Sequence, residues 1–155
     1  MFDSQVAPPV VLAVEKVSLS TMESTALGGG PAPDPYLAAC PSRGLLARIG
    51  EKWAALALVE LDAGPRRFGE LQRRLQGVSQ KMLTQTLRHL ERDGLITRTL
   101  LSDRPIQVSY ALTDRGRSLA PILFALKEWA RLHYHAVEAA RQTHDAAYPD
   151  PTPAG

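Results

Sequence analysis

Apolar positions in the middle of the chain recur every three or four residues, which is the period of an amphipathic helix. Three short runs of this kind lie before residue 76, and Gly50 and the Gly64-Pro65 pair separate them. They predict helices over residues 41–49, 52–61 and 67–75. Gly77 follows the third run and leaves only a short turn before the next one, as a helix-turn-helix unit requires.

The next run, residues 80–92, has one apolar face and one polar face. Ser79 is a favourable N-cap, and Asp93-Gly94 is a favourable stop. Its leucines fall on one side of the helix, at Leu83, Leu87 and Leu90. The opposite side carries Lys81, Thr84, Gln85, Arg88 and Arg92, with Glu91 at its margin. Such side chains address base edges and phosphates in the major groove of DNA, although an ordinary solvated helix face has a similar composition.

The period changes to two after this helix. Val108, Tyr110 and Leu112 alternate with polar or small residues, and residues 102–105 have the composition of a turn. The pattern predicts strands over residues 95–101 and 106–112. Helices followed by a hairpin predict a winged helix-turn-helix, a mainly α fold with a small β-hairpin wing. In this architecture the fourth helix lies in the major groove, and the hairpin tip with Arg104 reaches the neighbouring backbone or minor groove.

A final helix is predicted to begin after Thr113 and to be interrupted early, by Gly116 and Pro121. From Pro121 to about residue 143 it would span roughly 35 Å, which is longer than one small domain needs. We therefore expect its far part to pack on a second subunit, the alternative being a helix folded back on its own domain. The predicted dimer interface comprises Leu123, Leu126, Trp129, Ala130, His133 and Val137.

The formal net charge of +2 conceals a strong segregation of charge along the 155 residues. Residues 40–135 hold 16 Lys or Arg against 9 Asp or Glu, a balance of +7, whereas residues 1–39 carry −3 and residues 136–155 carry −2. A concentrated basic segment is typical of a nucleic-acid binder. The two ends are rich in proline, and the first also in glycine. We expect a flexible N-terminal extension over 1–39, a DNA-binding and dimerisation domain over 40–140 and a disordered tail over 141–155. Met22 as the true first residue is an alternative interpretation of the extension.

Composition argues against several other classes of protein. No apolar run approaches the length of a membrane span, so we expect a cytoplasmic protein without membrane contact. Cys40 is the single cysteine, which excludes an internal disulfide, and the four histidines form no metal-binding pattern with it. His133 and His135 point about 200° apart on a helix and do not share a metal. No phosphate loop or Gly-x-Ser-x-Gly elbow is present, so we expect neither an enzyme nor a cofactor.

Six short motifs in order and at matching spacing resemble one known family. They are Cys40-Pro41, Ile49-Gly50-Glu51-Lys52-Trp53, Gly64-Pro65-Arg66-Arg67-Phe68-Gly69-Glu70-Leu71, Gly77-Val78-Ser79-Gln80-Lys81-Met82-Leu83-Thr84, Leu90-Glu91-Arg92-Asp93-Gly94-Leu95 and Tyr110-Ala111-Leu112-Thr113. Over about residues 40 to 130 the chain resembles the HxlR-type bacterial winged helix-turn-helix regulators, relatives of the MarR group. Glu51 and the segment 57–59 depart from the usual pattern. The resemblance implies a homodimer that binds a pseudo-palindromic promoter site as repressor or activator, in some members under the control of a small molecule or an oxidant.

Roles follow for the basic and polar residues. We expect Gln80, Lys81, Thr84 and Gln85 to read bases, because recognition helices present their N-terminal half to the groove. Phosphate contacts are expected from Arg88 and Arg92, from Arg66, Arg67 and Arg74 on the third helix, and from Arg98 and Arg104 on the wing. Any one of these arginines has the alternative of a solvated or internally paired charge. Trp53, Phe68, Met82 and Tyr110 are predicted core residues.

Cys40 has two interpretations. It precedes a predicted helix and lies near Arg43, and both features favour the thiolate, as an oxidant sensor needs; certain relatives use a cysteine at this position in that way. The alternative is a small buried residue at the dimer seam. The function as a whole also has a rival: an effector-binding or protein-interaction module that keeps the winged helix while DNA contact is secondary.

Overall fold

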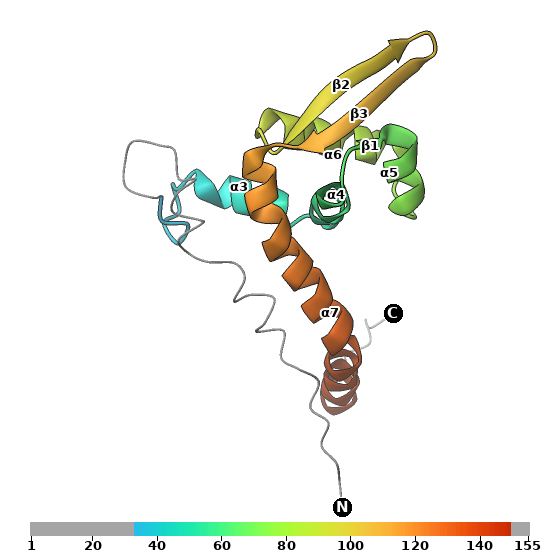
Figure 1. The fold of residues 1–155 in the computed structure, drawn as a ribbon. Helices are drawn as coiled ribbons and strands as arrows, with labels where there is room; N and C mark the ends of the chain where they lie inside the picture. The colour runs from blue at the N-terminus through green and yellow to red at the C-terminus, as the bar shows by residue number, and fades with distance from the viewer. Residues whose placement is uncertain (1–32, 150–155) are drawn as a thin grey trace, which may run out of the picture.

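The structure, a computed structural model, describes residues 33–149 and confirms the predicted winged helix-turn-helix (Figure 1). Its elements, in chain order, are α3 (Ser42–Ile49), α4 (Lys52–Asp62), β1 (Arg66–Arg67), α5 (Phe68–Arg74), α6 (Gln80–Arg92), β2 (Ile96–Asp103), β3 (Ile106–Leu112) and α7 (Asp114–Ala147). Most of the predicted N-terminal extension, including Met22, lies outside the described residues.

The core forms around α4. This helix buries Ala54, Ala57, Leu58 and Leu61, and α6 contributes Leu83, Leu87 and Leu90 to the same cluster, together with Leu71 of α5 and Leu123 of α7. Ile96, Tyr110 and Leu112 of the hairpin close it. Each fully buried leucine contributes about 1.5–3 kcal/mol of transfer free energy, so this one cluster positions α6 and the hairpin relative to each other.

The sheet has three antiparallel strands in the order β1-β3-β2. Arg66 and Arg67 were predicted to lie at the start of the third helix, and this is wrong: they form β1 and pair with Tyr110 and Ser109 of β3. Two residues are too few to show a period of two, so only pairing with a distant segment defines this strand. The pairing of β1 with β3 fixes the base of the wing to the segment just before α5.

The turn before α6 follows the sequence prediction. Gly77 has φ +91°, a left-handed conformation that favours glycine, and Ser79 caps the helix. The Ser79 Oγ accepts from the backbone N–H of Met82 at 3.0 Å. Met82 itself is 44% exposed, so its prediction as a core residue is wrong. It lies beside the buried face of α6 rather than on it.

The last helix, α7, is continuous from Asp114 to Ala147, whereas the sequence predicted an early interruption and an end near residue 143. Gly116 does not break the helix. A glycine is needed at this position because a Cβ would overlap the carbonyl oxygen of Leu95. Pro121 lies inside the helix, next to the buried Ala120 and Leu123. The prediction of a disordered tail is therefore wrong for residues 141–147, which are helical, and residues 150–155 lie outside the described part.

A single hydroxyl joins the end of α6 to the start of α7. The Thr113 Oγ1 donates to the carbonyl oxygen of Gly94 at 2.6 Å and accepts from the backbone N–H of Gly116 at 3.1 Å. The backbone N–H of Thr113 also donates to the carbonyl oxygen of Leu95, at 3.1 Å. These bonds fix the direction in which α7 leaves the winged helix.

Two helices leave apolar side chains uncovered. In α3 no residue is buried, and Leu45 and Leu46 are exposed. The part of α7 beyond Leu123 projects away from the rest of the protein (Figure 1) and exposes Leu126, Trp129, Leu132, Tyr134 and Val137. In the part of the chain that the structure describes, no helix has the length and hydropathy to cross a bilayer.

Candidate nucleic-acid interface

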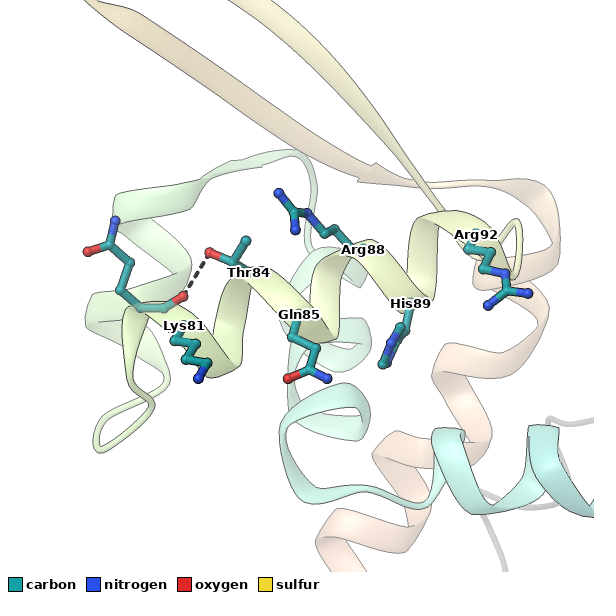
Figure 2. Close-up of a pocket in the computed structure, with 7 residues that line it drawn as sticks. Lys81, Thr84, Gln85, Arg88, His89 and Arg92 are labelled. Carbon is teal, nitrogen blue, oxygen red and sulfur yellow. Dashed lines mark hydrogen bonds between the residues drawn. The ribbon is translucent and has the colours of Figure 1, made fainter.

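The outer face of α6 is a continuous polar surface. Figure 2 shows its side chains, and the buried face of the same helix consists of other residues, Leu83, Thr86, Leu87 and Leu90. The side chains of the outer face line a shallow hollow of about 860 Å³: Gln80, Lys81, Thr84, Gln85, Arg88, His89 and Arg92. The structure thus brings together all six residues that the sequence placed on this helix for DNA contact. The sequence interpretation missed His89, although its position four residues after Gln85 places it on the same face.

The cations of this surface pair with no acidic side chain of the described residues. Within residues 33–149, no carboxylate lies within 4.0 Å of the charged nitrogens of Lys81, Arg88 or Arg92. Such side chains carry an unneutralised positive charge into solvent, where it attracts a polyanion. The Thr84 hydroxyl, by contrast, is already a donor, since it bonds the carbonyl oxygen of Gln80 at 2.7 Å (dashed line in Figure 2). Its oxygen remains available as an acceptor.

A second hollow, of about 660 Å³, lies between α6 and the wing. Arg88 of α6 and Arg98 of β2 both line it, so the hairpin carries a cation to the edge of the α6 surface. Phe68, Val108 and Tyr110 contribute apolar lining, and Glu91 adds one carboxylate. Arg98, whose predicted role is a phosphate contact from the wing, thus lies beside the α6 surface. Arg104 lies in the turn between β2 and β3 and is exposed, with its backbone N–H donating to the Ser102 Oγ at 3.3 Å.

The arginines expected to act as a backbone clamp are divided in the structure. Glu60 of α4 holds two of them: its carboxylate lies 3.3 Å from the Nε of Arg66 and 3.0 Å from the Nε of Arg74. The alternative of an internally paired charge therefore describes both residues. Arg67 is exposed and lines a third hollow of about 430 Å³ beside Arg73, a cation that the sequence interpretation did not single out.

Cys40 lies directly before α3 and is half-buried. Its Sγ is 2.9 Å from the Oγ of Ser42. Within residues 33–149 no group of three or more His, Cys, Asp or Glu side chains is arranged to hold a metal ion.

The residues predicted for dimerisation lie on α7 in two environments. Leu126, Trp129, Ala130 and Val137 are exposed. The ring of His133 stacks on Trp129 with centroids 4.4 Å apart, and its Nδ1 lies 2.9 Å from the carbonyl oxygen of Trp129. Leu123 was predicted for the interface, but it is only 5% exposed and packs in the core of its own protomer. A partner subunit has no access to its side chain.

Comparison with known proteins gives one consistent answer. The sequence profile of the HxlR-like helix-turn-helix family matches residues 48–138. An HTH-type transcriptional regulator of Methanothermobacter thermautotrophicus is 44% identical over 100 residues, which cover 64% of this chain and 75% of that protein. The HTH-type transcriptional regulator YtfH of Escherichia coli is 40% identical over 102 residues, covering 66% of this chain and 81% of its own.

Solved structures agree with the sequence relatives. The ytfH protein from Salmonella typhimurium superposes with a TM-score of 0.69 at 37% identity, over 72% of this chain and 99% of that one. The redox regulator HypR in its reduced form gives a TM-score of 0.58 at 36% identity, over 64% and 98% of the two chains. With the family profile covering more than half of its residues, the chain belongs to the HxlR-like helix-turn-helix family of transcriptional regulators.

Proposed function

We propose that the protein regulates transcription by binding, as a homodimer, a pseudo-palindromic site in promoter DNA. One observation carries the proposal: the exposed face of α6 presents three cations that have no acidic partner within residues 33–149, beside side chains able to hydrogen-bond base edges. Cations of this kind release counterions from DNA phosphates, and Gln, Lys and Thr match donor and acceptor groups in the major groove. Regulators of the same family give the assignment its context.

Within the interface we assign different roles to the two halves of α6. Gln80, Lys81, Thr84 and Gln85 read bases from the N-terminal half, with Thr84 acting as an acceptor because its proton is already used. Phosphate contacts come from the exposed cations Arg88, Arg92, Arg67, Arg98 and Arg104. Arg66 and Arg74, which Glu60 holds, shape the side of the interface near α5 and contact the backbone only where phosphate competes with that carboxylate.

The dimer joins through α7 and α3. Their exposed apolar side chains, Leu126, Trp129 and Val137 on one helix and Leu45 and Leu46 on the other, cost free energy in water and are covered in a two-fold interface. A symmetric dimer presents two α6 helices to successive turns of the major groove. Its operator then has two inverted half-sites, about 34–36 Å apart from centre to centre.

Cys40 gives the regulator a route to respond to oxidants. With one thiol per chain, the response is a mixed disulfide with a small thiol, alkylation, or a Cys40 to Cys40 bond across the dimer. The likeness to a redox regulator, HypR, favours this role. The competing role is a small residue that packs at the dimer seam. The test compares the wild type with a Cys40→Ser variant in the presence of diamide. If Cys40 is the sensor, the variant keeps DNA binding and loses the response to diamide that the wild type shows.

Binding to DNA upstream of the protein's own coding sequence tests the proposal directly. Gel shift and fluorescence anisotropy at two salt concentrations compare the wild type with the Lys81→Ala, Arg88→Ala double variant. A matched control, Arg131→Ala with Arg141→Ala, removes the same charge from the projecting part of α7. We expect tight, salt-sensitive binding by the wild type and the control, and its loss in the α6 variant.

The rival function makes the opposite prediction. If the winged helix serves mainly as an effector-binding or protein-interaction module, neutralising α6 leaves the weak DNA affinity unchanged. Equal binding by wild type and the Lys81, Arg88 variant therefore overturns the assignment of α6 as the recognition helix.

A further inference from the structure

The outer half of the wing carries apolar side chains that the core does not use. At its base the hairpin buries Ile96, Tyr110 and Leu112. Beyond the base, Leu100, Leu101 and Ile106 are 55%, 50% and 74% exposed. All three belong to β2 and β3, and the outer part of this hairpin projects well past the helices in Figure 1.

A bulge interrupts the regular geometry of β2 at the two leucines. Leu100 pairs with Val108, and the register shifts between Leu100 and Ser102, so that Leu101 has no partner on β3. An extra residue of this kind bends a strand and alters where its side chains point. β2 is also an edge strand of the sheet. Exposed apolar residues on an edge favour association with other molecules, and proteins normally replace them with charges. Their presence here is explained if a ligand covers them.

The charges around the three side chains indicate what kind of ligand covers them. Arg98 precedes them on β2 and Arg104 lies in the turn, and in residues 33–149 neither guanidinium has a carboxylate within 4.0 Å. Ile106 lines the same hollow as Arg98 and Arg88, so one member of the apolar group borders the α6 surface. One exposed carboxylate, Asp103, pairs across from Ile106, so the group has two cations and one acid around it. An apolar group with a net positive surround suits a duplex, which offers phosphates on either side of stacked bases.

We propose that Leu100, Leu101 and Ile106 form an apolar wedge that enters the minor groove beside the site bound by α6 and partly unstacks a base step, which kinks the DNA. This inference rests on the proposed function. Leucine and isoleucine are side chains that minor-groove proteins insert between bases, at a cost in unstacking that is offset by burial of the wedge. The kink favours flexible pyrimidine–purine steps, so the operator acquires a preference at positions where no base edge is read.

The test compares four forms of the full-length protein on a duplex from upstream of its own coding sequence. The wedge variant is Leu100→Thr, Leu101→Thr, Ile106→Thr, because threonine keeps a high strand propensity. A second variant, Arg98→Gln with Arg104→Gln, removes only charge. Tyr36→Thr with Leu37→Thr, two exposed residues outside the wing, is the matched control.

Three measurements are made on each form. Anisotropy across a salt series gives the affinity, energy transfer between the duplex ends gives the bending, and a fluorescent adenine analogue reports unstacking. Circular dichroism checks that each variant is folded.

The expected pattern differs between the variants. The wedge variant binds about tenfold or more weakly at every salt concentration, with an unchanged salt slope, less bending and less unstacking. The charge variant instead lowers the salt slope, by about 0.9 for each phosphate that the protein no longer neutralises. Wedge-variant binding and bending equal to the wild type, or a change in salt slope without a change in bending, overturn the wedge and leave the proposed function intact. If the wild type does not bind any duplex, the proposed function fails first, and the wedge with it.

Discussion

Arg48 of α3 forms a two-point hydrogen bond with Asp93 at the C-terminal end of α6. Its Nε donates to Oδ2 at 2.8 Å and its Nη2 to Oδ1 at 3.3 Å, across 45 positions of sequence. Asp93 is the C-cap of α6, where the negative end of the helix dipole disfavours a carboxylate. The guanidinium offsets that repulsion and at the same time ties α3, which has no buried residue of its own, to the helix that we assign to DNA reading.

Replacing Arg48 by Gln should therefore lower the free energy of unfolding by about 1 kcal/mol, since Asp93 is only 16% exposed and would lose its partner. Urea denaturation measures the change. Arg117→Gln is the matched control, because Arg117 and Asp114 pair at 2.8 Å but both are exposed, and it should cost at most about 0.5 kcal/mol. Equal losses in the two variants would show that the Arg48 pair contributes no more than a surface pair.

Arg88→Gln should reduce the slope of log affinity against log salt by about 0.9, since the variant neutralises one phosphate fewer. Gln85→Ala should leave the slope unchanged and reduce discrimination against a mismatched base by about 1–3 kcal/mol. Anisotropy titrations on a matched and a scrambled duplex measure both quantities. Arg131→Gln, which removes a cation paired with Glu128 on α7, should alter neither.

The N-cap of α6 separates stability from DNA binding. Ser79→Ala removes the acceptor for the Met82 N–H and should cost about 1 kcal/mol of unfolding free energy. Ser79→Asp should restore the cap and hence the stability, yet weaken DNA binding, because it adds a negative charge beside Lys81 and Gln80. Thermal melts and gel shifts on the same samples measure the two effects. Full DNA affinity in Ser79→Asp would place the N-terminus of α6 away from the phosphates.

Substitutions at two nearby apolar positions of α7, Leu126 and Leu123, should have different effects. Leu126 is 57% exposed, so Leu126→Glu should yield a folded monomer with weaker DNA binding, detected by light scattering after gel filtration. Leu123 is buried in the core, so Leu123→Ala should lower the unfolding free energy by about 2–4 kcal/mol. A Leu126→Glu protein that remains a dimer would exclude this face of α7 from the interface.

Glu128 makes one part of α7 sensitive to acid. The Nε of Arg131 donates a hydrogen bond to the Glu128 carboxylate at 3.0 Å, and the Lys127 ammonium lies 3.1 Å from it; both hold the pKa of that carboxyl below its ordinary value of 4.5. A lowered pKa means that the ionised form stabilises the folded state, so this contribution is present above the ordinary pKa and is lost as the pH falls through the folded-state value. The wild type should thus unfold at higher urea than Glu128→Gln near neutral pH, with the difference shrinking below pH 4.5. Carbon NMR titration of the carboxyl measures the pKa itself.

The sequence was sufficient where local pattern and tertiary packing agree. Residues 80–92 show a clear helical period with a serine cap, and α6 has the predicted face, cap and end. The alternation around Val108 and Tyr110 likewise predicted β3. Of the two, α6 holds most of the proposed DNA-contacting side chains, and its polar face was predictable from residue spacing alone.

Long-range contacts determined the features that the sequence predicted wrongly. Arg66 and Arg67 form a strand only because β3 lies beside them. Gly116 was predicted to interrupt the helix, but its missing Cβ makes room for the Leu95 carbonyl group. The pairing of Arg66 and Arg74 with Glu60 joins residues on β1, α5 and α4, and no local pattern of charge reveals it. In each case a neighbour distant in sequence sets the outcome.

The bonds of Thr113 connect the end of α6 to a helix of 34 residues, which is about 51 Å long. In a dimer held by α7, each winged helix is therefore joined to a long helix, and the pivot between them is held by the bonds of Thr113 together with the core packing of Ala120 and Leu123. A rotation of about 5° at that pivot would move the far end of α7 by roughly 4 Å relative to its own α6. The distance between the two half-sites that a dimer can bind is thus set by the angle at this junction, and a change at Thr113 would alter which operator spacings are accepted without altering any residue that touches a base.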